Sequence, residues 1–260
     1  MPMGLPYNAT QHILRDGQQL IDAAQRTGLD APVESCPGWA MRDLAWHIGE
    51  VWSFWSLVVN KRITTIEQLR AEPNEPQPSD DFLLDWVAAA HNGIHSTLNS
   101  TPTETEFWTW TGANRDLWWL RRRMAQETAV HRWDAERTVG DVYEIPIAVA
   151  ADGIDEFLQW FAPKNRGASI GGTAHIHCTD TDRDLATGSD DIDAVNGEWM
   201  IHRLDENGIE FEHAHAKGDV AIRGRARDIL LWLWGRDGGP IEFIGDEAIA
   251  RRIVAGADLD

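Results

Sequence analysis

The stretch Glu127-Thr-Ala-Val-His131-Arg-Trp-Asp134 decides how the first half of the chain is read. Glu127, His131 and Asp134 lie four and three positions apart, a spacing that places them on one face of a helix. Met124 extends the same face with an apolar side chain, so the polar residues continue a core-facing stripe. Because an unpaired polar group is costly to bury, the pattern predicts that these three side chains have partners in the core.

A second helix, predicted over residues 41–60, carries the same anomaly. His47 interrupts an apolar stripe of Leu44, Ile48 and Val51. In a helical bundle, an inward-facing Glu-x-x-x-His pair and a histidine from another helix can converge on a metal ion. Two imidazoles and one carboxylate leave coordination positions open, as catalytic zinc sites do. The spacing alone leaves a buried hydrogen-bond cluster as the alternative interpretation.

Helical periodicity dominates residues 1–144 and predicts a four-helix bundle. We expect the helices at 9–28, 41–60, 81–98 and 115–139, with loops over 71–79 and 101–114. On the third helix we expect Phe82, Trp86, Ala90 and Ile94 to face inward.

The pattern changes near Pro146 and predicts a second, smaller domain over residues 145–260. A helix at 149–161 precedes short runs of strand character, and two helices end the chain. The strands are expected at 174–178, 199–204, 209–213 and 220–223, and the helices at 225–234 and 246–254. We therefore expect an α+β protein whose sheet is mostly antiparallel.

Composition limits the classes of partner. Acidic residues outnumber basic ones by 42 to 23, a formal net charge of −19, which disfavours nucleic acid and anionic membrane surfaces. Two cysteines are too few for a disulfide framework, and no apolar run is long enough to span a bilayer, so we expect a cytoplasmic protein. Cys36, in the turn Cys36-Pro37-Gly38-Trp39, is expected to anchor that turn.

Three further pairs of histidines have spacings that place both rings on one side of an element. His175 with His177, and His213 with His215, alternate along predicted strands, and a third pair lies on the 81–98 helix. Either strand pair could bind a metal, but we interpret both as solvated residues.

Three segments, in order, resemble the mycothiol-dependent maleylpyruvate isomerase family. They are Val33-Glu-Ser-Cys-Pro-Gly-Trp-Ala-Met-Arg-Asp-Leu-Ala-Trp-His47-Ile-Gly, Arg123-Met-Ala-Gln-Glu127-Thr-Ala-Val-His131-Arg-Trp-Asp134-Ala and Ile222-Arg-Gly-Arg-Ala-Arg-Asp-Ile-Leu-Leu-Trp-Leu-Trp-Gly-Arg236. The resemblance implies a DinB-like metal-binding bundle followed by a domain similar to sterol-carrier folds.

The resemblance also implies the chemistry. It places a divalent metal, usually zinc, on His47, Glu127 and His131, and it implies that Asp134 and Arg236 act beside the metal. Mycothiol or another small thiol is the implied cosubstrate. The implied reaction is isomerisation of the maleylpyruvate type, or thiol S-transfer, on a small electrophilic and carboxylated substrate.

Two other function classes stay open at this stage. A metal-dependent hydrolase or lyase would use water in place of the thiol, and a non-catalytic protein would only bind metal or a small ligand. In each case we expect small-molecule partners, no nucleic acid, no membrane, and a monomer or small homo-oligomer.

Overall fold

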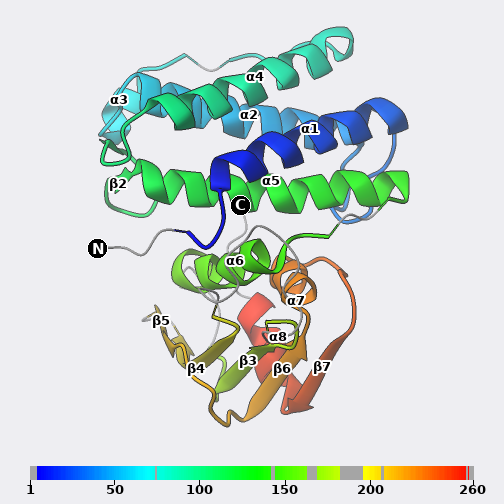
Figure 1. The fold of residues 1–260 in the computed structure, drawn as a ribbon, viewed down its shortest axis with the longest axis vertical. Coiled ribbons are helices and arrows are strands. Elements are labelled where there is room, and N and C mark those ends of the chain that lie inside the picture. The colour runs from blue at the N-terminus through cyan, green and yellow to red at the C-terminus, as the bar shows by residue number, and fades with distance from the viewer. Residues whose placement is uncertain are drawn as a thin grey trace. The chain divides into compact units, whose positions relative to one another are not determined.

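The computed structural model describes residues 5–73, 75–141, 144–162, 169–181, 196–205, 208–255 and 257. It divides into two compact units, Asn8–Tyr143 and a unit that joins Met1–Tyr7 to Glu144–Asp260. The long helices form the first unit and a five-stranded sheet lies in the second (Figure 1). The predicted α+β class is confirmed.

The first unit is a four-helix bundle of α1 (Ala9–Thr27), α2 (Met41–Asn60), α4 (Asp80–Ser100) and α5 (Leu117–Val139). Helices α1 and α2 each pack against α4 and α5. Asn8 caps α1 by accepting a hydrogen bond from the Gln11 backbone N–H, and Gly140 ends α5 in the left-handed conformation. Local capping signals therefore mark the start of α1 and the end of α5.

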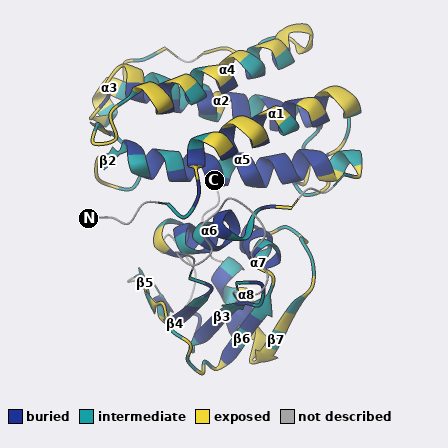
Figure 2. Ribbon diagram, in the orientation of Figure 1, coloured by how far each residue is buried: buried dark blue, intermediate teal, exposed yellow. Residues whose placement is uncertain are grey.

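The bundle core contains a high proportion of large side chains. Trp52 and Trp133 are buried, and the Trp52 indole donates a hydrogen bond of 3.2 Å to Thr128. Helix α5 is buried along most of its length, as its dark blue colour in Figure 2 shows. It is also the helix that carries the polar stripe, so that stripe lies inside the protein.

The buried face of α4 (Asp80–Ser100) differs in part from our expectation. Ala90 and Ile94 are buried as predicted, whereas Phe82 is 65% exposed. Leu83, Val87 and His91 complete the buried face. Apolar residues occur on two faces of the first turns of this helix, so periodicity alone could not choose between them.

A short helix and a two-stranded ribbon in this unit are absent from our prediction. The short helix α3 (Ile66–Arg70) begins at a capping box made by Thr65 and Gln68. Strands β1 (Glu106–Phe107) and β2 (Arg115–Asp116) pair in an antiparallel ribbon before α5. The long helix α5 therefore begins at Leu117, two residues later than predicted.

The second unit is built on a sheet of strand order β5-β4-β3-β6-β7. Its strands are β3 (Ala174–Cys178), β4 (Glu198–Asp205), β5 (Gly208–Glu212), β6 (Val220–Gly224) and β7 (Ile241–Gly245), and its helices are α6 (Ile147–Trp160), α7 (Ala226–Leu233) and α8 (Glu247–Ala255). Only β3 and β6 pair in parallel among these strands, so the sheet is mostly antiparallel, as predicted.

Strand β7 is absent from our prediction. It is an edge strand with two of its five residues partly buried and three exposed, so it carries little of the apolar alternation that marks a strand.

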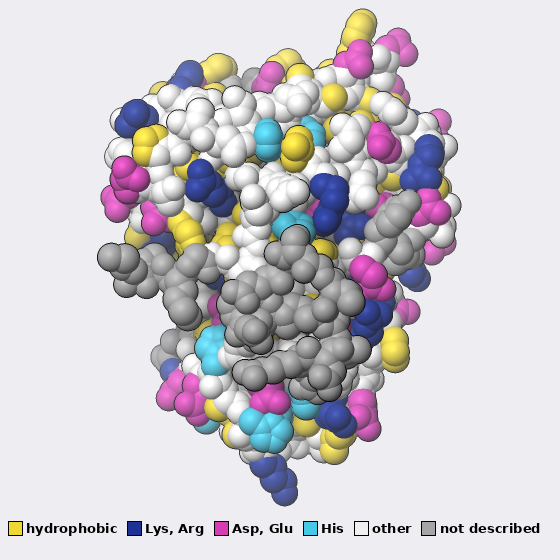
Figure 3. All heavy atoms as spheres, viewed as in Figure 1, with side chains coloured by type: hydrophobic (Ala, Val, Ile, Leu, Met, Phe, Trp, Pro, Cys, Tyr) yellow, Lys and Arg dark blue, Asp and Glu magenta, His cyan; other side chains and the backbone are white. Residues whose placement is uncertain are grey.

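Charged side chains are spread over the visible surface in Figure 3. Within the described part of the chain, none of the helices has the length and apolar character needed to cross a bilayer.

Candidate metal centre

Three of the predicted residues converge in the bundle. Nε2 of His47 on α2 lies 3.1 Å from Oε1 of Glu127, and Nε2 of His131 lies 3.4 Å from the same oxygen on α5. One ligand atom from each residue lies within 4.8 Å of the other two. The structure thus gathers two imidazoles and a carboxylate at one point, a donor set that suits zinc and other divalent transition metals.

Asp134 lies behind this trio. Its carboxylate is fully buried, and Oδ2 is 2.9 Å from Nδ1 of His131. A proton on Nδ1 that points to Asp134 leaves the lone pair of Nε2 directed toward Glu127. A metal-ligating histidine commonly has this carboxylate partner, which fixes the ring and its tautomer. Asp134 therefore has the place of a residue that orients a ligand.

The charges of the trio follow from burial and partners. Burial raises the pKa of Glu127, but Arg123 and hydrogen bonds to His131 and His47 outweigh it, so this pKa lies well below its ordinary value. Burial lowers the pKa of His131, but Asp134, Cys36 and Glu127 outweigh it, so this pKa lies well above its ordinary value. A cation that binds here would displace the proton from Nε2 of His131.

Arg123 is a member of the site that our sequence analysis missed. It is buried and forms an ion pair with Oε2 of Glu127, one helical turn away. That contact leaves Oε1 of Glu127 facing the two histidines. The signal was present, because Arg123 lies four residues before Glu127 on the same helix face.

The turn before α2 supplies the wall of the site. The Trp39 ring lies 5.2 Å from the His47 ring and is stacked 6.4 Å from the His131 ring. The backbone N–H of Trp39 donates a hydrogen bond to the backbone carbonyl of Cys36. Gly38, between them, has a φ of +88°, which favours glycine. The Pro-Gly turn thereby positions an aromatic face beside both candidate ligands.

Cys36 lies beside the polar stripe, which the sequence did not indicate. Its buried thiol lies 3.5 Å from Oδ2 of Asp134, and Cys36, His131 and Asp134 form a second possible ligand group. All three members of that group are buried, whereas the His47 side chain is 33% exposed. Only a group that solvent can reach can offer open positions to a substrate, so the group that contains His47 is the better candidate for a catalytic metal site.

Arg236 lies in the second unit, three residues after the end of α7. Gly235 takes a left-handed φ of +76°, and the Arg236 guanidinium donates a hydrogen bond of 2.7 Å to the Trp234 carbonyl. Arg223 and Arg225, earlier in the same unit, form ion pairs with Glu242 and Glu144. The role of Arg236 in the reaction stays a prediction.

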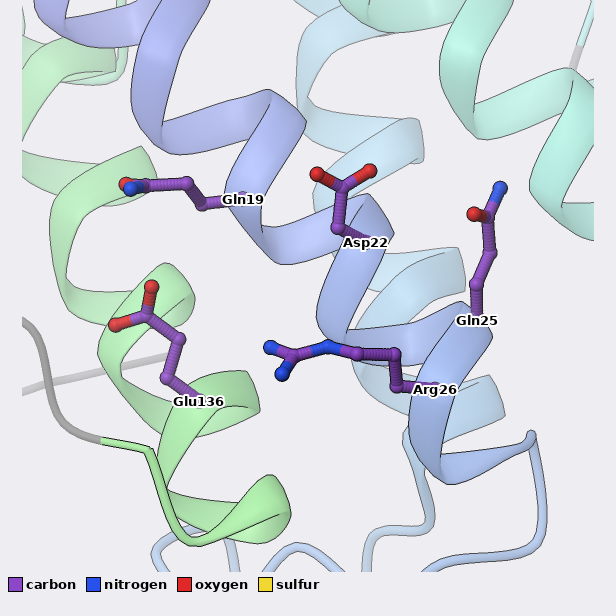
Figure 4. Close-up of a pocket in the computed structure, with 5 residues that line it drawn as sticks. All are labelled: Gln19, Asp22, Gln25, Arg26 and Glu136. Atoms are coloured by element: carbon purple, nitrogen blue, oxygen red, sulfur yellow. The ribbon is translucent and has the colours of Figure 1, made fainter.

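A hollow of about 500 Å³ lies elsewhere in the bundle (Figure 4). Four of its lining residues come from α1, and Glu136 comes from α5, with the Arg26 guanidinium reaching toward it. Its lining residues are Gln19, Asp22, Gln25, Arg26 and Glu136. None of the five is a histidine or a cysteine, so this hollow lacks the imidazole donors of the group formed by His47, Glu127 and His131.

Comparison with known families gives the same identification for both halves. The mycothiol maleylpyruvate isomerase N-terminal domain matches residues 10–136, and the MDMPI C-terminal domain matches residues 148–252. The chain belongs to the mycothiol-dependent maleylpyruvate isomerase family. This is a family of enzymes, so the predicted family and the expectation of an enzyme are confirmed.

Solved structures of the family show the same fold. One is a crystal structure of a histidine-to-alanine mutant of the mycothiol-dependent maleylpyruvate isomerase, with 13% identity, a TM-score of 0.56, and coverage of 90% of this chain and 92% of that one. The other is a crystal structure of the mycothiol-dependent maleylpyruvate isomerase, with 15% identity, a TM-score of 0.53, and coverage of 90% and 88%. The comparison with curated proteins found no match.

Proposed function

We propose that this protein is a metal-dependent and mycothiol-dependent isomerase of the maleylpyruvate type that acts on a small, carboxylated electrophile. The observation that carries the proposal is the convergence of His47, Glu127 and His131 in a domain of this family. Residues 1–144 would be the DinB-like metal-binding bundle and 145–260 the sterol-carrier-like domain. Zinc is the ion that the donor set favours.

The residues of the bundle would divide the work at the metal. When bound, a divalent ion supplies a Lewis acid that lowers the pKa of a thiol into the neutral range. Asp134 keeps the His131 ring in place, and Arg123 keeps Glu127 ionised and turned toward both histidines. The Trp39 face beside the histidines excludes water from one side of the site.

The reaction that fits a thiolate is reversible addition. Sulfur forms a bond to one carbon of an alkene conjugated to a carbonyl, and the alkene electron pair moves onto that carbonyl. The former double bond is then single and rotates, and loss of the same sulfur restores the alkene in the other geometry. If the carbon next to the carbonyl instead gains a proton, the sulfur stays bound as a thioether and the reaction is S-transfer. Asp134 is the carboxylate that we assign to proton handling.

Arg236 would bind the carboxylate of the substrate. A guanidinium offers two parallel N–H donors to a carboxylate, which an ammonium group cannot do. In a chain with a formal charge of −19, an anionic substrate needs such a local cation.

The expected setting is the cytoplasm. Both cysteines are free and buried, as in a reducing compartment, and a small thiol is available there as cosubstrate. We propose small-molecule partners only, with neither nucleic acid nor membrane, and a monomer or small homo-oligomer.

The test is a thiol-dependence assay. Zinc-loaded protein is mixed with maleylpyruvate and related electrophiles, with and without mycothiol, and isomerisation and thiol loss are followed. The proposal predicts isomerisation only when thiol is present, and its loss in His47→Ala but not in His202→Ala, an exposed histidine of the sheet. Turnover that needs no thiol would contradict the proposal and favour the hydrolase or lyase. Mycothiol consumed without isomerisation would indicate the S-transferase.

A further inference from the structure

A second group of histidines lies in the sheet unit, outside the candidate metal centre. His175 and His177 alternate along β3, so both rings lie on the same face of the sheet. Glu198 is the direct partner of His177 in the antiparallel pair of β3 and β4, which places its side chain on that face too. His215 follows β5 and joins them. Figure 3 shows histidine and acidic side chains side by side on the visible face of this unit.

These side chains are close enough to share one ligand. His175, Glu198 and His215 each offer a ligand atom within 4.8 Å of the other two. Nδ1 of His215 lies 2.9 Å from Glu198, and Nε2 of His177 lies 3.5 Å from Oε1 of the same carboxylate. The His175 and His215 rings are 5.2 Å apart. One carboxylate therefore lies among three imidazoles.

His175 supplies an independent observation. Its side chain is 7% exposed, yet Nε2 is buried and makes no hydrogen bond. The nearest carboxylate oxygen, on Glu198, is 3.7 Å away, beyond hydrogen-bond distance. A buried ring nitrogen without a partner is unfavourable in a folded protein, and this one points toward the other donors of the group. A cation among them would satisfy it.

We propose that His175, Glu198 and His215 bind a second divalent cation, of the zinc class, with His177 as a fourth donor. Imidazole and carboxylate together suit zinc, nickel and copper better than magnesium or calcium. The ion would join β3, β4 and the segment after β5, which are separate along the sequence. The site is independent of the proposed reaction, since all four residues lie in the sheet unit.

The structure groups these histidines differently from the pairs that their sequence spacing suggested. His213 does not join the group, because its Nε2 lies 3.0 Å from Oδ1 of Asp155. His215, two residues later, turns to Glu198 instead. Both strand pairs were interpreted as solvated residues, but His175 is buried. Only the pairing of β3 with β4 brings Glu198 to the first pair, and single-strand spacing cannot reveal that.

The test is a zinc titration of the full chain against a chromophoric competitor. The background variant His131→Ala removes the proposed bundle site and leaves the sheet intact. His215→Ala is then added, because His215 is 77% exposed and its loss should not disturb folding. The matched control adds His202→Ala, which removes a histidine of β4 that pairs with Glu212.

We expect two zinc equivalents for the wild type and one for His131→Ala. The double variant with His215→Ala should bind that remaining ion at least about tenfold more weakly, while the control keeps it. Zinc should raise the Tm of His131→Ala and of the control but not of the double variant. Cobalt(II) in His131→Ala should give the visible absorption of a four-coordinate ion.

Two results would overturn the second site. One is that His131→Ala binds no zinc, and the other is that adding His215→Ala leaves its zinc affinity unchanged. Failure of the bundle site gives a different result. In that case wild type and His131→Ala would bind the same single ion, and His215→Ala alone would weaken its binding in the same way.

Discussion

Asp134 shows how one buried residue can control a candidate ligand without touching the ion. It is fully buried, holds Nδ1 of His131, and accepts from the thiol of Cys36. Its negative charge therefore acts on the position and proton of His131. Since Glu127 has its own partner in Arg123, the two candidate ligands on α5 are oriented by different residues.

Asp134→Asn should therefore weaken metal binding without unfolding the bundle. The amide keeps the size of the side chain but lacks the charge that orients His131. Loss of such a partner commonly lowers metal affinity by about 10- to 100-fold. Zinc competition titration measures this, and Asp228→Asn, which removes another buried carboxylate, is the control. Equal affinity in wild type and Asp134→Asn would show that Asp134 does not orient the ligand.

Sequence spacing predicted the polar stripe of α5 but not the whole site. Glu127, His131 and Asp134 lie within about two turns of one helix, so local geometry alone places them together. Trp39 and Cys36 reach the site through a tertiary contact between the turn and α5. No helical period encodes that contact, so only the structure reveals it.

At the scale of elements, α1 and α4 approach closely because Gly17 faces His91. The His91 ring packs against Gly17 and donates a hydrogen bond of 3.0 Å to the Ile13 carbonyl. A Cβ at position 17 would overlap the ring. The polar side chain of His91 is thus buried between two helices, and its hydrogen-bond partner is a backbone carbonyl of α1.

Gly17→Ala should destabilise the bundle by about 1–3 kcal/mol, because the His91 ring has to move out of a well-packed interface. Gly93→Ala on α4 is the matched control, since its new Cβ would meet only Ser56 Oγ at 4.0 Å. There the lower entropy of the unfolded chain should raise stability by about 0.5–1 kcal/mol. Urea unfolding measures both variants, and a loss of stability no larger in Gly17→Ala than in Gly93→Ala would contradict the packing argument.

His91 should also make the bundle less stable in acid. Burial lowers the pKa of His91, the Ile13 carbonyl raises it, and His95 lowers it, so the pKa in the fold lies below its ordinary value. The unfolded chain then takes up the proton first as pH falls below about 6.5. The stabilisation is present above that pH and is lost as pH falls toward the lower pKa of the fold.

Unfolding free energies between about pH 8 and pH 5 test this linkage. The wild type should lose more stability over that range than His91→Gln, which keeps an N–H donor for Ile13 but does not titrate. All other groups titrate in both proteins and cancel in the difference. Parallel curves of unfolding free energy against pH for the two proteins would mean that His91 titrates alike in the folded and unfolded states.

The elements that the sequence predicted well are those with strong local signals. Helix α2 was predicted at its observed bounds from its helical apolar stripe, and strand β3 from its short run of strand character. The prediction that Phe82 faces inward was wrong, because apolar residues lie on two faces of the first turns of α4. Strand β7 was missed because an edge strand forms through pairing with its one neighbour, β6, and that pairing is not local in the sequence.

For the whole molecule, a change of period separates two architectures within one chain. Helical spacing before Pro146 and alternating strands after it predicted a bundle and a sheet, and each forms a compact unit. Periodicity carried that information because each unit buries its own apolar face. The order of the strands depends on pairing between distant segments, so it needed the structure.

Arg236 is the residue through which the second unit would enter the reaction. Arg236→Lys should lower kcat/KM for an anionic substrate nearly as much as Arg236→Ala, since lysine cannot make a two-point contact with a carboxylate. Both variants should bind zinc and melt close to the wild-type temperature. Full turnover by Arg236→Ala would refute the assignment, and Arg223, Arg225 and Arg227 would become the candidates.

The metal content of the chain tests the central claim most directly. Wild type and His131→Ala are loaded with zinc under identical conditions, desalted and measured by elemental analysis. Because His131 contributes one of three converging donors, the variant should contain one zinc ion fewer per chain and keep its helical content. Equal zinc in the two folded proteins would contradict the claim that His47, Glu127 and His131 hold a metal.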